Sequence, residues 1–128
     1  QTTLGADTKR ESMDIEDLQG KLREFAKARD WEQYHTPKNI SMALAAEAAE
    51  LLEIFQWLTP EESMAVKTSQ AQKQSVEDEL GDVLYYAIRL ADVLDIDLER
   101  AVLNKMAKNA EKYPAAGPMT PRSRREPS

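Results

Sequence analysis

The chain has 128 residues, a hydrophobic content of 41%, no cysteine and a net charge of −6 at neutral pH. This length and hydrophobic content predict one domain with a packed core, and the lack of cysteine excludes a disulfide framework or a thiolate metal site and suits a reducing cytoplasm. The negative charge disfavours a nucleic-acid polymer as the partner, because such binders usually carry a basic face, and no apolar run predicts a membrane span or a signal peptide.

The first half of the chain predicts two long helices. Apolar residues recur every three or four positions from Asp14 to about Arg29, which is the helical period, and Asp14 is a suitable N-cap. Residues 30–38 break this pattern, and Pro37 favours a loop there. The second helix is expected from about residue 39 to residue 58.

The second half predicts a short helix and two longer ones. Thr59 is a suitable N-cap, and Glu62 completes a capping box with it. Residues 67–75 are polar and predict no defined element, whereas residues 76–94 have helical periodicity. A last helix should begin after Asp97 as its N-cap and end near Tyr113, just before a proline.

These patterns predict an all-α domain of four main helices. No strand pattern or internal repeat is present. The domain is expected to occupy residues 13–114, with disordered segments at residues 1–12 and 115–128. Met13 is a candidate for the natural start, in which case the residues before it would be vector-derived or a ragged terminus.

Four acidic side chains border the predicted apolar faces of two helices. Glu47 and Glu50 form an i, i+3 pair beside one face, and Glu79 and Asp82 form a second pair beside the other. Helices of an α bundle pack side by side, so the two pairs are able to converge. The apolar faces themselves are expected to consist of Leu44, Ala48, Leu51, Phe55 and Leu58 on the earlier helix, and of Val76, Leu80, Val83, Ala87, Ala91 and Leu94 on the later one.

Converging carboxylates repel one another unless a cation lies among them. Oxygen ligands without histidine or cysteine suit Mg²⁺, with Mn²⁺ as a substitute, and Mg²⁺ commonly takes further ligands from phosphate groups. This favours chemistry on a phosphate ester or anhydride. Glu53 lies one step further round the helix and either joins the metal ligands or only supports them. The competing interpretation is that the acids form an ordinary solvated face.

The two acidic pairs, separated by 28 residues, resemble the signature of the MazG-like all-α nucleoside triphosphate pyrophosphohydrolases. The resemblance covers about residues 14–114 and extends to the dCTP pyrophosphatase branch of that family. The blocks that carry this closer resemblance are RDWEQYHTPKN (29–39), ELLEIFQW (50–57), DELGDVLYY (78–86) and KMAKNAEKYP (105–114).

The resemblance implies Mg²⁺-dependent hydrolysis of a nucleoside triphosphate, dCTP or a similar compound, to the monophosphate and pyrophosphate, as housecleaning of the nucleotide pool. It further implies a homodimer or homotetramer with pockets at subunit interfaces. Related dCTP-hydrolysing proteins have a histidine at the position of Leu22, which is a departure in the region of base recognition. The implied metal ligands and catalytic residues are Glu47, Glu50, Glu79 and Asp82, the base pocket contains Trp31 and Trp57, and the other nucleotide contacts are Tyr86, Lys105 and Asn109.

The spacing of the aromatic and basic residues agrees with this implication. Trp57 and Tyr86 each follow an acid of the proposed site by seven residues, which places an aromatic ring about 10 Å along the helix from a carboxylate. Lys105 and Asn109 share one helix flank, suited to phosphate oxygens. Each residue also has an ordinary alternative, since tryptophans often pack in cores or interfaces and lysines are often solvated. His35, the only histidine, is a candidate for touching the substrate, although a loop or capping role is more common.

Two other functions compete with hydrolysis as interpretations of this sequence. A redox di-metal carboxylate site normally needs Glu-x-x-His on two helices, which a single loop histidine does not supply. A helical oligomer that binds nucleotides or a protein partner without catalysis remains the alternative, and a pyrophosphate assay with a panel of dNTPs separates it from an enzyme.

Overall fold

The computed structural model describes residues 13–115, and all regular secondary structure in that range is helical. The expected all-α class with four long helices is therefore confirmed. The disorder expected for residues 1–12 and for the tail from residue 116 lies outside the described residues. In chain order the elements are α2 (Ile15–Ala28), the 3-10 helix η1 (Glu32–Tyr34), α3 (Pro37–Phe55), α4 (Pro60–Ala65), the 3-10 helix η2 (Val66–Thr68), α5 (Gln70–Val93) and α6 (Leu98–Lys112).

Side-chain caps set the helix starts, and most were predicted. The Asp14 carboxylate accepts a hydrogen bond from the Asp17 amide, and the Asp97 carboxylate accepts one from the Arg100 amide. The capping box is formed in both directions, since the Thr59 hydroxyl accepts from the Glu62 amide and the Glu62 carboxylate accepts from the Thr59 amide.

Two helices begin earlier than the apolar pattern indicated. α3 starts at Pro37, because Thr36 caps it and proline without an N–H group fits the first helical turn, so the assignment of Pro37 to a loop was wrong. α5 starts at Gln70, six residues before Val76, after a cap by Ser69. The added turns contain glutamine, lysine and alanine, which favour helices without contributing an apolar stripe. The polar segment 70–75 is therefore part of α5.

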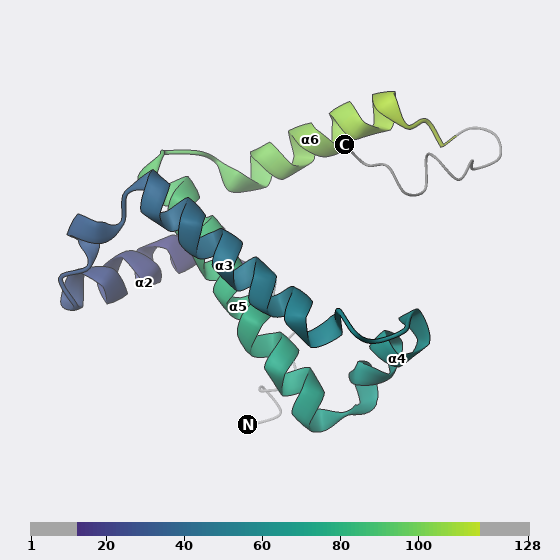
Figure 1. Ribbon diagram of the computed structural model, residues 1–128. Coiled ribbons are helices and arrows are strands. Elements are labelled where there is room, and N and C mark those ends of the chain that lie inside the picture. The colour runs from purple at the N-terminus through teal and green to yellow at the C-terminus, as the bar shows by residue number, and fades with distance from the viewer. Residues whose placement is uncertain (1–12, 116–128) are drawn as a thin grey trace, which may run out of the picture. The chain divides into compact units, whose positions relative to one another are not determined.

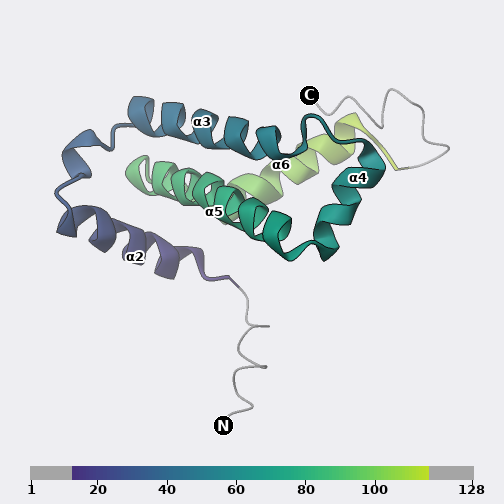
Figure 2. The ribbon, with the colours of Figure 1, turned by 60° about the horizontal axis from the view of Figure 1, so that its bottom comes forward.

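The helices α3 and α5 lie side by side and form the main packing pair of the fold (Figure 1 and Figure 2). The short α4 and η2 connect them at one end (Figure 2). α2 packs on α5, where Phe25 of α2 meets the Tyr85 ring edge-on at 6.4 Å between centroids. Carboxylates on α3 and α5 can therefore approach one another in the contact between these two helices.

The buried core of the described residues is small. Its apolar members are Ala26, Ile40, Val66, Ile88 and Ala91. Two residues expected in the core are half exposed, namely Leu80 at 52% and Leu94 at 48%, and Ala48 is also exposed. Leu94 forms the C-cap of α5 rather than a position within the helix, and both side chains are only partly covered.

A network of charged side chains joins α2 to α5. The guanidinium of Arg23 donates to both oxygens of Asp92, through Nε at 3.0 Å and NH2 at 2.9 Å. The buried Arg89 donates to the same carboxylate at 3.0 Å. The pKa of Asp92 is lowered, first by its hydrogen bonds from Arg23 and also by the charges of Arg23 and Arg89, against the opposing effect of burial. The ionised form of Asp92 thus stabilises the contact between these helices.

α6 belongs to a second compact unit that begins at Ile96. It is amphipathic, begins after Asp97 and ends before Tyr113 and Pro114, as predicted. It has no buried residue. In the described part of the chain, no helix has both the length and the apolar character needed to cross a membrane.

We expect Asp92→Asn to lower the free energy of unfolding at pH 7 by about 2 kcal/mol, the scale of hydrogen bonds to charged groups. Because the folded-state pKa is below the ordinary 3.8, this contribution is present above pH 3.8 and is lost as the pH falls through the folded-state value. Urea unfolding of both proteins should therefore show curves that differ at pH 7 and approach each other as the pH falls below 3.8.

The matched control is Asp17→Asn, which removes an exposed i, i+4 ion pair with Lys21. It should change the free energy of unfolding by less than about 0.5 kcal/mol. Equal losses in the two variants would contradict a specific role for Asp92.

Candidate functional site

Three of the four predicted acids meet between α3 and α5. Carboxylate oxygens of Glu47, Glu50 and Glu79 lie within 4.8 Å of one another. The prediction that acids from the two helices converge is confirmed for these three, which we call the acid cluster. Asp82 is not among the three, yet its negative charge raises the pKa values of both Glu50 and Glu79, so it lies close enough to act on the cluster.

The pKa values of two carboxyls of the cluster are raised by their surroundings. The pKa of Glu79 is raised, first by hydrogen bonding with the Glu47 carboxyl, then by burial and by the charges of Glu47 and Asp82. The pKa of Glu50 is raised, first by the charge of Glu79 and then by burial. The charge of Glu53 adds to the effect on Glu50, which places Glu53 near the cluster although it does not join it. Without a counter-ion, the cluster favours uptake of a proton.

The acid cluster fits a hard cation. Glu47 Oε1 and Glu79 Oε1 are buried and have no hydrogen-bond partner in the described structure. A buried carboxylate oxygen without a partner is costly, and a cation is the partner that would relieve both this cost and the repulsion. All three donors are carboxylates, which suits Mg²⁺ or Mn²⁺ better than softer metals.

A pocket of about 230 Å³ lies next along the same helix pair. Ala43 lines it and lies one turn before Glu47 on α3, about 6 Å along the axis. Tyr86 lines it from α5, and its pKa is raised first by burial and then by the charges of Glu47 and Asp82. The pocket therefore adjoins the acid cluster. Its full lining is Tyr34, His35, Asn39, Ile40, Ala43 and Tyr86.

The pocket contains two of the predicted substrate contacts, His35 and Tyr86, while Trp31 lies beside it. The Trp31 ring is 41% exposed, packs edge-on against Phe25 at 5.8 Å between centroids and lies 6.4 Å from the His35 ring. His35 Nδ1 accepts a hydrogen bond from Arg89 Nε at 3.0 Å. The pKa of His35 is lowered, first by burial and then by the charge of Arg89.

Trp57 does not lie on a helix flank. α3 ends at Phe55, and Trp57 occupies the turn after it. The prediction that Trp57 lies on the same helix as Glu50, two turns further on, was therefore wrong. Its side chain is 86% exposed. A ring this exposed is not part of a pocket built by the described residues of one chain.

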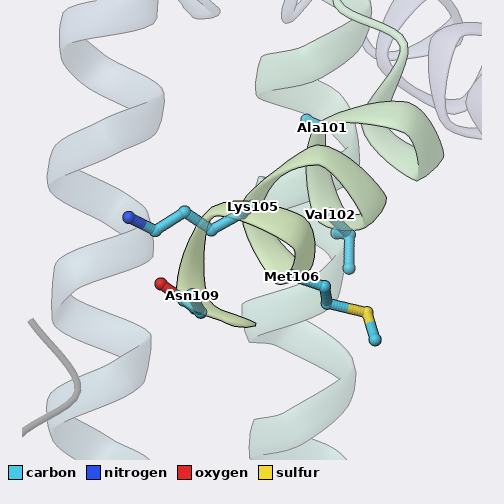
Figure 3. Close-up of a pocket in the computed structure, with 5 residues that line it drawn as sticks. All are labelled: Ala101, Val102, Lys105, Met106 and Asn109. Carbon is cyan, nitrogen blue, oxygen red and sulfur yellow. The ribbon is translucent and has the colours of Figure 1, made fainter. Parts of the chain in front are cut away.

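Lys105 and Asn109 lie on α6, in the second compact unit, whereas the acid cluster lies in the first. Figure 3 shows both polar ends on one side of the helix, with Val102 and Met106 pointing to the other side. The predicted polar flank of this helix thus exists. Its role toward a nucleotide stays a prediction.

Sequence reasoning missed Asn39, Ala43 and Arg89. Asn39 stands in the block 29–39 and lines the pocket, so the block contained a signal for it. Arg89 is the one charged residue in the apolar run from Leu84 to Ala91, which is a signal that was not used. Ala43 gave no chemical signal, because a small apolar residue on a helix is usually packing.

Comparison with known proteins identifies relatives of this chain. The model of the MazG-like family matches residues 42–119. The human dCTP pyrophosphatase 1 is 44% identical over 101 residues, which is 79% of this chain, and the rat protein of the same name is 41% identical over 100 residues, 78% of this chain. The chain spans only 59% of the length of these curated relatives.

A solved structure is also similar. The crystal structure of a pyrophosphatase from Archaeoglobus fulgidus DSM 4304 superposes with a TM-score of 0.73 and has 43% sequence identity. The match covers 82% of this chain and 96% of that one. The similarity therefore extends over nearly the whole archaeal chain.

We expect Glu79→Gln to stabilise the metal-free protein at pH 7, because it removes a charge from a repelling cluster. A carboxyl whose folded-state pKa is raised destabilises the fold above that pKa, and this loss disappears as the pH falls toward the ordinary value of 4.5. Thermal unfolding in EDTA should therefore depend less on pH in the variant between about pH 4.5 and 7.

When these scans are repeated with Mg²⁺ increased in 10-fold steps, the melting temperature of the wild type should rise, and that of the variant should rise much less. Glu77→Gln, on the same helix but outside the cluster, is the control and should respond to Mg²⁺ like the wild type. An equal response in all three proteins would place the cation elsewhere.

Proposed function

Because the chain belongs to the MazG-like family, as its sequence blocks predicted, we propose that it is a nucleoside triphosphate pyrophosphohydrolase. It would convert a dCTP-like (deoxy)nucleoside triphosphate to the monophosphate and pyrophosphate. The names of the human and rat relatives support this reaction and this substrate. The observation that carries the proposal is the acid cluster, whose buried, unpartnered oxygens adjoin a pocket of a size suited to a base.

Glu47, Glu50, Glu79 and Asp82 are the proposed ligands and catalytic residues, with Glu53 close by. When Mg²⁺ is bound, or Mn²⁺ in its place, it supplies charge neutralisation at the phosphates and activation of water. The three carboxylates of the acid cluster would supply the negative charge that attracts this cation. Their position between α3 and α5 also limits access of solvent, since Glu47 and Glu79 are both half-buried.

The nucleoside would occupy the neighbouring pocket. Tyr86 and His35 line it, and Trp31 stands beside it with an exposed ring able to stack on a base. The distance of about one to two helical turns between pocket and cluster suits a base at one end and a phosphate chain at the other. Lys105 and Asn109 on α6 are proposed contacts to phosphate, as basic and polar groups with a common direction.

We expect Glu50→Gln, and likewise Asp82→Asn, to abolish pyrophosphate release from dNTPs, with a loss of at least 100-fold in kcat, on the scale seen for lost electrostatic stabilisation. The measurement is a pyrophosphate assay over the four dNTPs with Mg²⁺. Glu77→Gln is the control and should keep wild-type rates. Binding of dNTPs by the wild type without any release of pyrophosphate would favour the non-catalytic alternative, a helical oligomer that binds nucleotides or a partner.

The same dNTP panel tests the tryptophans. Trp31→Ala and Trp57→Ala should raise KM roughly tenfold to hundredfold through lost stacking, about 1–3 kcal/mol per base, with a smaller change in kcat. Unchanged KM values and unchanged ranking of the dNTPs in both variants would assign these rings to packing alone.

The chain is further proposed to act as a homodimer or homotetramer in the cytoplasm, where it would remove unwanted nucleotides. Large apolar side chains of the helix pair and its connection are exposed, which is unusual for an isolated small domain. Trp57, the most exposed of them, would reach a nucleotide only if a second copy completed the pocket. The exposed group in this part comprises Met42 at 54%, Leu52 at 60%, Trp57 at 86%, Met64 at 67%, Leu80 at 52%, Leu84 at 39% and Leu94 at 48%.

Sedimentation equilibrium at micromolar concentration should give a mass two or four times the 14.5 kDa of one chain. Leu80→Glu, on the exposed flank of α5, should shift the protein toward monomer because it buries a charge in the interface. Lys73→Glu, on the same helix among exposed polar residues, should leave the mass unchanged. A fully active monomer would contradict this assembly.

A further inference from the structure

His35 is held by a buried arginine. Arg89 is 5% exposed, and its Nε donates to His35 Nδ1 at 3.0 Å. A guanidinium is always protonated and has no acceptor, so Nδ1 is the unprotonated nitrogen of the ring. In the neutral imidazole the proton is therefore on Nε2, which makes that atom a hydrogen-bond donor.

The residue that carries this donor lines the pocket beside the acid cluster. His35 lines this pocket together with Tyr86 and Asn39. In the described part of the chain, His35 Nδ1 accepts the hydrogen bond from Arg89, and His35 Nε2 has no hydrogen-bond partner. The Nε2–H group remains available to an acceptor from outside the described chain.

Arg89 is not required for charge balance at Asp92. Arg23 already neutralises that carboxylate with two hydrogen bonds, and burying a second guanidinium carries a desolvation cost that an apolar side chain would avoid. What Arg89 adds is a rigid planar donor anchored on Asp92 through NH1 and directed at His35 through Nε. The lowered pKa of His35, due to burial and then to the charge of Arg89 and opposed by that of Glu32, agrees with a neutral ring.

We propose that Arg89 is a positioning residue, which fixes the His35 ring with its Nε2–H group directed to a hydrogen-bond acceptor of the bound nucleoside. The acceptor would be a carbonyl oxygen or an unprotonated ring nitrogen of the base, or an oxygen of the sugar. This proposal rests on the proposed function, because it deepens the recognition of the nucleotide at that site.

The test uses the fact that His35 is the only histidine of the chain. In ¹⁵N-labelled full-length protein, the long-range ¹H–¹⁵N spectrum of imidazole groups reports this one ring without assignment. The wild type should show a protonated Nε2 and an unprotonated Nδ1. Arg89→Met should give intermediate shifts for both nitrogens, the signature of exchanging tautomers. Arg23→Met, which also removes an arginine from Asp92 but not from His35, is the matched control and should keep the wild-type spectrum.

Kinetics supply the second readout. Arg89→Met should raise KM for the best dNTP about tenfold, as expected for one lost hydrogen bond, and change kcat by less than about threefold. In the background of His35→Ala, adding Arg89→Met should cause no further rise in KM, because the arginine acts through the ring. Arg23→Met should leave KM within about twofold of the wild type.

Two results would overturn the proposal: a wild-type tautomer in Arg89→Met, or a KM rise of the same factor whether or not His35 is present. If Arg89→Met does not fold, Arg89→Lys retains the charge beside Asp92 without the planar donor, and the same shifts in spectrum and KM are expected.

The proposed function can fail separately. A wild type that releases no pyrophosphate from any dNTP contradicts the hydrolase. Titration with dCMP then still decides the present proposal: a shift of the Nε2–H signal that is lost in Arg89→Met supports it, and no shift in the wild type overturns it.

Discussion

The packing of α3 on α5 forces acidic side chains together, and the rest of the site depends on this constraint. Glu47 and Glu79 have buried oxygens that face no donor. Folding alone would not select such an arrangement, since uncharged residues of similar size would pack there without repulsion. The helix pair is thus made less stable at the place where we propose that a cation binds. The Asp92 network with Arg23 and Arg89 lies well along α5 from this region.

The sequence predicted the helical class and the convergence of the acids because both follow from local periodicity. An i, i+3 pair has a defined direction once the helix is known, and Glu47, Glu50 and Glu79 meet as that direction requires. Caps such as Asp14 and Thr59 were equally readable, since capping involves only neighbours in the chain.

Features that depend on distant residues could not be predicted in this way. The exposure of Leu80 depends on which elements pack on α5, and the periodicity of the sequence does not show this. The turn at Trp57 breaks the helix two residues before the ring, so a projection along the helix axis misplaced it. The contact between Arg89 and His35 joins residues 54 positions apart in sequence, and only the folded structure makes this pair visible.

The uninterrupted α5 has a consequence for how this chain is able to change over evolution. Glu79, Tyr86 and Arg89 all project from one 24-residue helix, so their spacing along the axis and their angles about it are fixed by the helix itself. Insertion of a single residue between Glu79 and Tyr86 would rotate everything beyond it by about 100° and move Tyr86 away from the acid cluster. A change of length within this stretch of α5 would therefore disrupt the arrangement, whereas a substitution would preserve it. Under the proposed function, a new substrate preference would arise by substitution on a helix of fixed length or by remodelling of the connecting turns.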